Sequence, residues 1–329
     1  MAVDTVVATQ VQVPAWRRIG TMREAGLIAI ILALGIVMSF ASPHFLTFGN
    51  MRAMLMSFSV EGIVVVGMTI LLIVGGIDLA VGSVVCFAMV LAGSLFLAGV
   101  DPWTASLFGI LASSLIGAIM GFFVTVVGLN HFITSLAAMV IVRGLCLVIT
   151  KGTPLSLFTM PASFKAVGQG TFHGVPYVIL IFVAVVILFD FLLRRATAFR
   201  KVFYTGSNEK AALYSGIKTK QVKFWVTVLC STLAGVAGVI YMSRFGAATP
   251  TFGVGMELNI IAAAVIGGAS LNGGSGTILG AILGIALLSV VTSSLILLDV
   301  SVYWQDMIKG CILLAAVSID HFLHKRKAI

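Results

Sequence analysis

Few side chains in this chain could do chemistry, and most of these lie inside or beside long apolar runs. Glu61 and Arg143 stand within such runs, where a lone charge costs roughly 2.5–3.5 kcal/mol on insertion into a bilayer. Each should therefore face the protein interior or water. Both are candidates to contact a polar solute crossing the membrane, and structural pairing with polar groups is the alternative reading.

Two glycine-rich breaks interrupt the apolar sequence at corresponding places in its two halves, at residues 75–83 and 267–276. Glycine permits positive φ and close backbone approach, so such breaks can present backbone donors and helix ends to a solute. Asp78 in the first break is expected to cap the helix that follows, and it is also a path candidate together with Asn272 in the second. A tight turn capped by Asp78 is the structural alternative.

The motifs of the common enzymes are missing. The sequence has no G-x-x-x-x-G-K-[ST] loop, so the chain is not expected to bind and hydrolyse ATP in that way. It has no metal-ligand spacing, no serine elbow and no paired catalytic carboxylates. Beyond Glu61 few acids lie deep within the apolar runs, which argues against a proton relay. A non-catalytic protein without a cofactor of its own is predicted.

Composition places these residues in a membrane protein. Of 329 residues 60% are hydrophobic and 9% charged, and the mean hydropathy is +1.16, whereas soluble domains carry roughly 25% charged residues. The net charge of +9 does not indicate a nucleic-acid partner, because the basic residues flank apolar runs as the positive-inside rule predicts for cytoplasmic loops. A multi-pass protein embedded in a lipid bilayer follows.

Ten apolar segments of about the length of a membrane span can be separated at glycine, proline and polar clusters. They lie approximately at 24–42, 51–74, 80–99, 103–128, 131–150, 175–194, 222–243, 256–270, 275–298 and 302–321. Segments 80–99 and 256–270 are candidates for broken or partly inserted helices. An all-α fold of about ten transmembrane helices is expected.

The basic clusters assign the sides of the membrane. They lie in the tail 1–23, in the island 194–223 and in the tail 322–329, which places both termini and the island in the cytoplasm. A single transmembrane domain over 24–321 is predicted. Within the island, residues 206–217 are expected to form a short helix between two glycine breaks, suited to docking on another protein.

Three groups of motifs resemble the permease subunits of bacterial ABC importers for ribose, xylose, arabinose, galactose and related solutes. Residues 75–83 are similar to that family's Gly-Gly-Ile-Asp-Leu-Ser-Val-Gly signature, with Ala80 in place of serine. Residues 132–145 are similar to its fifth-span pattern, where His131 stands in place of a frequent proline. Residues 206–217, with the glycine-rich sequence 262–277 downstream, match its coupling-loop and late-span patterns.

The resemblance covers roughly residues 25–320 and implies a permease fold of the vitamin-B12-importer type in the bacterial inner membrane. The implied partners are a second permease copy, identical or paralogous, ATPase subunits that bind ATP and Mg, and a periplasmic or lipid-anchored solute-binding protein. The cargo implied is a monosaccharide. The residues implied to couple the chain to its ATPase are Gly206, Asn208, Glu209, Ala211, Ala212, Leu213, Gly216 and Ile217.

Other interpretations remain open at this point. An ion-coupled secondary transporter or a channel for a small polar solute would have similar hydropathy. Within the importer class, the cargo could be a nucleoside or a furanosyl signalling molecule of the autoinducer-2 type, because fold analogy does not fix the ligand. The outer loop at 151–174 could be part of a gate or a landing surface for a binding protein.

Overall fold

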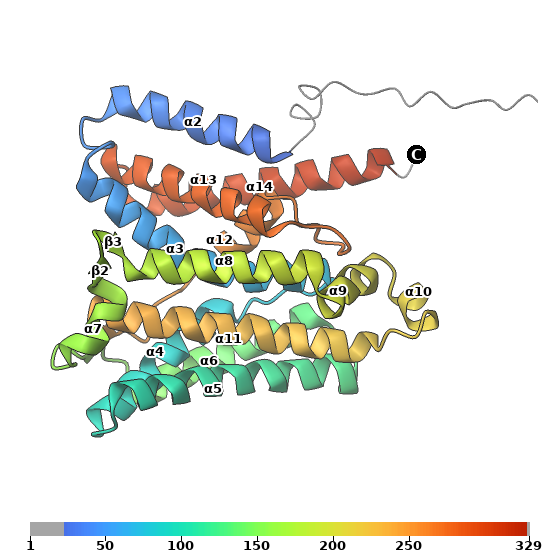
Figure 1. The fold of residues 1–329 in the computed structure, drawn as a ribbon, viewed down its shortest axis with the longest axis horizontal. Helices are drawn as coiled ribbons and strands as arrows, with labels where there is room; N and C mark the ends of the chain where they lie inside the picture. Colours follow the sequence, from blue (N-terminus) through green and yellow to red (C-terminus); the bar gives the residue numbers. More distant parts are fainter. Residues whose placement is uncertain (1–22, 328–329) are drawn as a thin grey trace, which may run out of the picture.

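A computed structural model describes residues 23–327 as a bundle of helices that run roughly along one axis (Figure 1). The helices are α2 (Arg23–Ala41), α3 (Phe48–Ile73), α4 (Val81–Leu97), α5 (Pro102–Phe122), η1 (Phe123–Val127), α6 (His131–Thr150), α7 (Ala162–Gln169), α8 (Tyr177–Arg195), α9 (Thr197–Ser207), α10 (Glu209–Tyr214), α11 (Thr219–Phe245), α12 (Met256–Ile266), α13 (Ile278–Leu297) and α14 (Val302–Lys327). Two short antiparallel pairs join β1 (Leu155–Ser156) to β4 (Ala247–Ala248) and β2 (Thr171–Phe172) to β3 (Val175–Pro176).

Each of the ten predicted apolar segments contains a helix. Within residues 23–327, seven helices are long and apolar enough to cross a membrane, namely α2, α3, α5 with η1, α6, α8, α11 and α13. The two segments that were expected to be irregular hold shorter apolar helices, α4 and α12, of 17 and 11 residues. Because an α-helix rises about 1.5 Å per residue, α12 covers only about half of a bilayer core. Between Phe245 and α12 the chain forms the two-residue strand β4 and is otherwise irregular.

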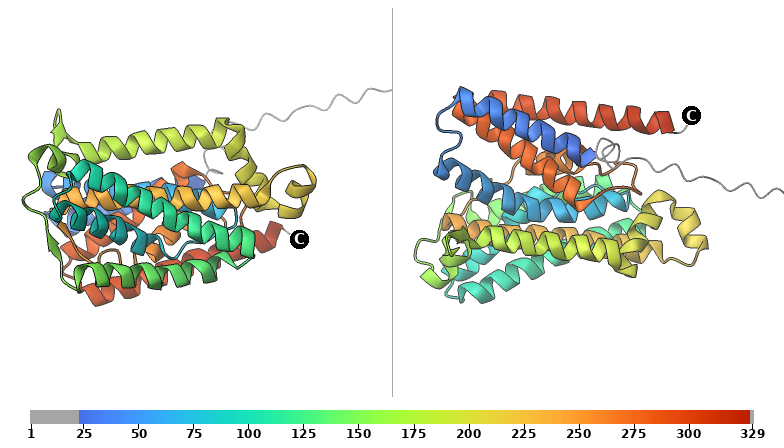
Figure 2. Two further views of the ribbon diagram at one scale, coloured as in Figure 1. Left: turned by 90° about the horizontal axis from the view of Figure 1, so that it is seen from below. Right: turned by 45° about the horizontal axis from the view of Figure 1, so that its top comes forward.

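The core of the bundle is formed by α3, α4, α11 and α12, around which the other helices pack (Figure 2). In the most apolar window of α3, 83% of the residues are buried, against 11% in α2 at the edge. Small residues make the close approaches possible, as expected for helices that pack in lipid. A Cβ at Gly117 of α5 would lie 2.7 Å from the Cβ of Ser231 in α11, and one at Gly284 of α13 would meet the carbonyl of Ala263 in α12.

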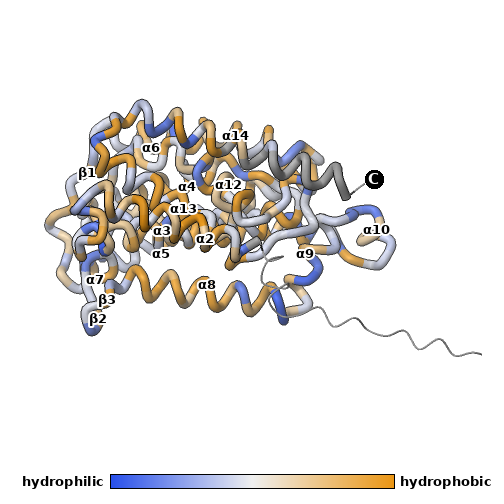
Figure 3. The backbone as a smooth tube through the Cα atoms, turned by 90° about the horizontal axis from the view of Figure 1, so that it is seen from above, coloured by the Kyte–Doolittle hydropathy of each residue, from blue (hydrophilic) through white to orange (hydrophobic). Residues whose placement is uncertain are grey.

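The two ends of the bundle are polar and its middle is apolar (Figure 3). One end carries α9 and α10, and the other carries α7 with the β2–β3 pair. The long helices between them, such as α8, are largely hydrophobic, which is the pattern of a membrane-spanning bundle.

Two details differ from the sequence-based expectation. Gly206 does not break the chain, because it lies inside the last turn of α9, and the interruption before α10 falls at Asn208. Asp78 does not cap the first turn of α4, which begins at Val81 with no side-chain cap. Its Oδ1 instead accepts a 2.7 Å hydrogen bond from the backbone N–H of Ala80, so it closes the turn that precedes the helix.

Candidate functional site

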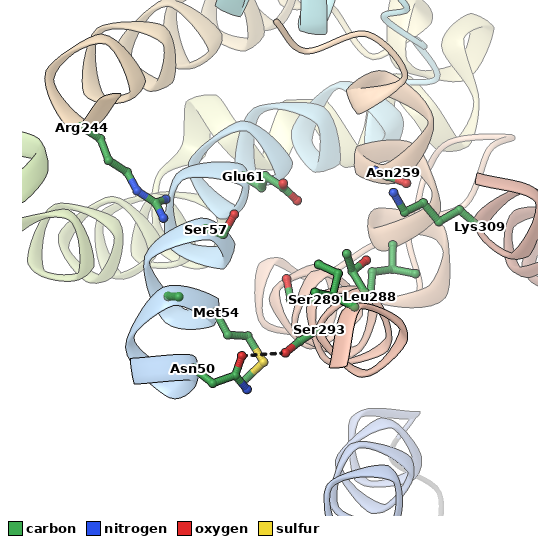
Figure 4. Close-up of a pocket in the computed structure, with 13 residues that line it drawn as sticks. Asn50, Met54, Ser57, Glu61, Arg244, Asn259, Leu288, Ser289, Ser293 and Lys309 are labelled. Carbon is green, nitrogen blue, oxygen red and sulfur yellow. Dashed lines mark hydrogen bonds between the residues drawn. The ribbon is translucent and has the colours of Figure 1, made fainter. Parts of the chain in front are cut away.

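A cavity of about 330 Å³ lies between α3, α12, α13, α14 and the end of α11 (Figure 4). We call it the polar cavity, because most of its lining carries amide, hydroxyl or charged groups. The polar lining residues are Asn50, Ser57, Glu61, Arg244, Asn259, Ser289, Thr292, Ser293 and Lys309. Arg244 stands in the last turn of α11, whereas α10 precedes the first turn of that helix, so the cavity occupies the half of the bundle remote from α10.

One carboxylate and two cations face this cavity from three helices. Glu61 comes from α3, Arg244 from α11 and Lys309 from α14, and their side chains point into the same space (Figure 4). Among the described residues Glu61 has no ion-pair partner within 4.0 Å, and Arg244 Nη1 is buried without a hydrogen-bond partner. Lys309 contacts Asp306, three residues earlier in α14, at 3.5 Å. Among the described residues the cavity therefore holds an acceptor on Glu61 and a donor on Arg244 that no protein group satisfies.

The structure does not bring the four sequence-based path candidates together. Only Glu61 lines the polar cavity. Asp78 is fully buried beside α4, and its Oδ2 has no partner among the described residues. Arg143 donates from Nη1 to the carbonyl oxygens of Pro250 and Phe252, at 3.0 and 2.6 Å, and so ties α6 to the irregular chain before α12. Asn272 belongs to the loop between α12 and α13.

Several cavity residues were not identified from the sequence. Arg244 ends an apolar run, a position where a basic residue ordinarily reaches the membrane surface. Lys309 lies three residues after Asp306, a spacing that by itself indicates an ordinary ion pair on one helix face. Asn50 and Asn259 are single amides in different helices. The sequence carries little indication of these residues. The cavity is lined from five different helices, and no spacing along the chain shows that its residues lie together.

The two glycine-rich breaks meet each other and the end of α9, at what we call the glycine junction. The N–H of Gly274 in the second break donates to the carbonyl of Ile73 at the end of α3, at 2.8 Å. A Cβ at Gly206 of α9 would meet this same Ile73 carbonyl and would lie 2.7 Å from the nitrogen of Gly274. A Cβ at Gly273 would lie 3.2 Å from the Cα of Gly75. Only glycine permits three backbones to pack this closely.

Helix α10 stands out from the end of the bundle as a compact, capped unit (Figure 1). Asn208 Oδ1 accepts from the N–H of Ala211 at 3.0 Å, the geometry of an N-cap. At the other end Gly216 has φ +82°, and the N–H of Ile217 donates to the carbonyl of Ala212 at 3.0 Å, which closes the helix with a left-handed turn. The predicted short helix is confirmed over Glu209–Tyr214.

The side chains of α10 divide into a buried face and an exposed apolar face. Ala212 is buried, whereas Leu213 and Tyr214 are 58% and 88% exposed. Ala211 is exposed as well, beside a small and largely apolar groove that also includes Tyr204. Apolar side chains at the water-facing tip of a membrane protein are a surface that a protein partner would cover.

A continuous series of polar contacts leads from α10 to the first glycine-rich break. Glu209 forms a 2.7 Å ion pair with Lys223 in α11. The Thr227 hydroxyl lies 2.9 Å from the Lys223 carbonyl oxygen and 3.0 Å from Nε2 of His131 in α6. His131 Nδ1 lies 2.8 Å from the carbonyl oxygen of Ile77, so it carries the proton and donates. Three helices and the break are thereby connected.

The fold and these features define a multi-pass membrane protein, with a polar cavity between its helices and a short exposed helix at one end. The chain belongs to the family described as branched-chain amino acid transport system / permease component, whose profile matches residues 50–317.

Curated relatives are similar over nearly the whole chain. The ribose import permease protein of Escherichia coli strain K12 is 36% identical over 323 residues, 98% of this chain and 99% of the relative. The ribose import permease protein of Bacillus subtilis is 36% identical over 301 residues, 92% and 94% of the two chains. The D-allose transport system permease protein of E. coli is 33% identical over 311 residues, 94% and 93%. The resemblance to sugar importer permeases is thus confirmed, and no solved structure matches.

Proposed function

We propose that this chain is the permease subunit of an ABC importer that moves a monosaccharide across the bacterial inner membrane by alternating access. The observation that carries the proposal is the full-length similarity, at 33–36% identity, to permeases named for ribose and D-allose. The polar cavity supports it chemically, because neutral amides and hydroxyls surround the charges of Glu61, Arg244 and Lys309. A polyhydroxy solute can use both the donors and the acceptors of such a lining.

The proposed topology has ten membrane segments, cytoplasmic termini and a fold of the vitamin-B12-importer type. The start of α2 and the end of α14 lie toward the end of the bundle that carries α9 and α10 (Figure 1), which supports a common side for both tails and the basic island. In this arrangement α12 and the irregular chain before it together return from the outer to the inner side. Irregular backbone at this depth is tolerated where its polar groups are satisfied, and here Arg143 donates to the carbonyl oxygens of Pro250 and Phe252.

The proposed energy source is a separate ATPase subunit, which binds ATP and Mg, while this chain is not an enzyme and needs no cofactor. The ATPase docks on α10, and its nucleotide-driven closure displaces α9 and α10 as a unit. The glycine junction and the contacts from Glu209 to His131 are the routes by which this displacement reaches both glycine-rich breaks. A two-state rearrangement there closes one side of the solute path and opens the other.

Two further partners complete the proposed importer. A second permease copy, identical or paralogous, would pack beside α14, which exposes Tyr303, Trp304 and Met307 next to the polar cavity. A periplasmic or lipid-anchored solute-binding protein would deliver the sugar at the end formed by α7 and the β2–β3 pair. That end lies opposite α10. This arrangement is needed because the binding protein delivers the sugar on one side of the membrane and the ATPase acts on the other.

Reconstitution tests this function. We expect proteoliposomes that contain the permease, its ATPase and its binding protein to accumulate labelled ribose, arabinose or allose only when ATP is supplied. Leucine serves as the control solute, because the family description names branched-chain amino acids. Sugar uptake by this chain alone, driven by an ion gradient without an ATPase, would instead establish the secondary-transporter alternative.

Glu61 is expected to contribute directly to uptake. Replacing it with alanine removes a charged hydrogen-bonding group worth about 1.5–3 kcal/mol, so we expect the initial rate of sugar uptake to fall roughly 10- to 100-fold. Glu61→Gln retains the shape of the side chain and one acceptor oxygen, so its initial rate of uptake should fall less than that of Glu61→Ala. Initial rates in the same proteoliposomes measure the effect.

Asp306→Asn provides the matched control for Glu61. It removes a carboxylate that pairs with Lys309 at 3.5 Å but does not line the polar cavity. Its uptake should stay within about threefold of wild type, because an exposed ion pair contributes little. Wild-type uptake by Glu61→Ala, at unchanged protein level and ATPase capture, would remove the polar cavity from the solute path.

A further inference from the structure

A second concave surface, remote from the polar cavity, lies between α9 and the first three turns of α11. We call it the α9–α11 groove. Its volume is about 550 Å³, and its lining combines apolar residues with Lys201, Lys218 and Gln221. It shares no lining residue with the groove beside α10, and of the residues implied to couple the chain to its ATPase it includes only Gly216, which follows α10.

The groove is ordered from polar to apolar along α11. Lys218 and Gln221 line it where α11 begins, and Trp225 follows one turn later. Val226 and Leu229 line it furthest from that start of the helix. Lys218 and Leu229 are 11 residues apart, which corresponds to about 16 Å along a helix axis. With α9 at the cytoplasmic surface, the groove has a charged mouth at the level of the headgroups and an apolar floor at the level of the first acyl carbons.

The charge at the mouth is positive and uncompensated. No Asp or Glu lines the groove, and within residues 23–327 neither Lys201 nor Lys218 forms an ion pair. The nearby acids are already engaged, since Asp190 contacts Arg194 at 2.8 Å and Glu209 contacts Lys223 at 2.7 Å. Two free ammonium groups beside an apolar trough are complementary to a phosphate that carries hydrocarbon chains.

The surroundings favour a lipid over a protein segment. Trp225 is 65% exposed, and the neighbouring α8 exposes Ile187, Leu188 and Phe191 along its hydrophobic length. Phe189 of α8 contacts Phe199, which lines the groove, so an apolar surface suited to hydrocarbon lies beside it. A half-exposed tryptophan between charged and apolar zones is typical of the membrane interface.

We propose that the α9–α11 groove binds an anionic phospholipid, with the phosphate held between Lys201 and Lys218 and an acyl chain lying along Val222, Val226 and Leu229. The bound lipid joins α9 to α11 within two turns of Gly206, so it stabilises the position of the helix that carries the glycine junction. This inference depends on the proposed cytoplasmic placement of α9, but not on sugar or ATP.

Tryptophan fluorescence of the full chain in bilayers tests the proposal. Phosphatidylcholine bilayers are supplemented with brominated phosphatidylglycerol or brominated phosphatidylcholine, which quench nearby indoles. Trp225→Phe supplies the background from the remaining members of the four tryptophans. Each lysine near the surface is expected to raise the affinity for an anionic lipid about fivefold. Half-maximal quenching of Trp225 should therefore require at least tenfold less brominated phosphatidylglycerol than brominated phosphatidylcholine.

Charge-removing variants locate the effect. Lys201→Gln combined with Lys218→Gln should abolish the preference for the anionic lipid, whereas Lys220→Gln, two residues away in α11 but outside the groove, should retain it. Equal quenching by both lipids in the wild-type protein overturns the proposal, even if the double variant fails to fold. The proposal is also overturned if the double variant and Lys220→Gln lose the preference for the anionic lipid to the same extent.

The competing occupant is a segment of the ATPase subunit. Two results together would make the groove a protein interface and the lipid assignment wrong. The first is that added ATPase displaces the anionic lipid, and the second is that the double variant no longer captures the ATPase. Because quenching is measured without sugar or ATP, a failure here leaves the importer proposal intact. Loss of ATP-driven sugar uptake in reconstitution likewise leaves the lipid result standing.

Discussion

A chain that carries both Leu213→Asp and Tyr214→Asp is expected to fold and insert but to lose its ATPase subunit. Both side chains are exposed, at 58% and 88%, on α10, which stands out from the end of the bundle (Figure 1). Apolar and aromatic anchors at the centre of an interface typically contribute about 2 kcal/mol or more each. Together the two changes should weaken ATPase binding roughly 1000-fold, measured as the dissociation constant of the detergent-solubilised complex.

Lys210→Ala is the control on the same helix. Lys210 is an exposed charge of α10, and no ion pair involves it among the described residues, so its loss should change the dissociation constant less than about threefold. Ala211→Arg adds bulk on the exposed face and should also weaken docking. Ala212 is a poorer position for this test because it is buried, and a bulky residue there would disturb α10 itself. Full ATPase capture by the double aspartate variant would refute docking on this helix.

The helical architecture was predictable because hydropathy and helix-breaking residues are local signals. Each of the ten apolar segments contains a helix, and the short helix after Asn208 lies where its cap and Gly216 place it. The irregular turns before α4 and after α12 were equally visible as glycine-rich sequence. Properties that depend on a residue and its near neighbours were therefore accessible without a structure.

Positions defined by contacts between distant segments were not accessible. Gly206 was expected to interrupt the chain, yet it is helical, because its missing side chain makes room for the Ile73 carbonyl of another helix. Arg143 was expected either to pair with polar groups or to contact a solute, but its partners, two backbone carbonyls of the chain before α12, could not be named from the sequence. Arg244 and Lys309 reach the polar cavity only through the packing of α11 and α14 against α3 and α12. No spacing along the chain reports such pairings.

Gly206→Ala is expected to separate ATP hydrolysis from transport. The new Cβ would meet the Ile73 carbonyl and the Gly274 nitrogen, both backbone atoms that cannot rotate away. Overpacking of this kind costs about 1–3 kcal/mol, which outweighs the roughly 1 kcal/mol that alanine gains over glycine within a helix. The result should be an α9 displaced from both glycine-rich breaks while α10 remains available for docking.

The decisive quantity is the number of sugars imported per ATP hydrolysed. For Gly206→Ala we expect this ratio to fall at least tenfold while the complex still assembles and hydrolyses ATP. Gly99→Ala, in the turn between α4 and α5, is the matched control: its φ of +93° makes alanine cost about 1–2 kcal/mol, but no atom lies within 4 Å of the new Cβ. The two variants should lose similar stability, so a ratio lowered in both would trace to general destabilisation. If the ratio of sugars imported to ATP hydrolysed falls only in Gly206→Ala, the contact between α9 and the two breaks is needed for coupling, because the control variant leaves that contact unchanged.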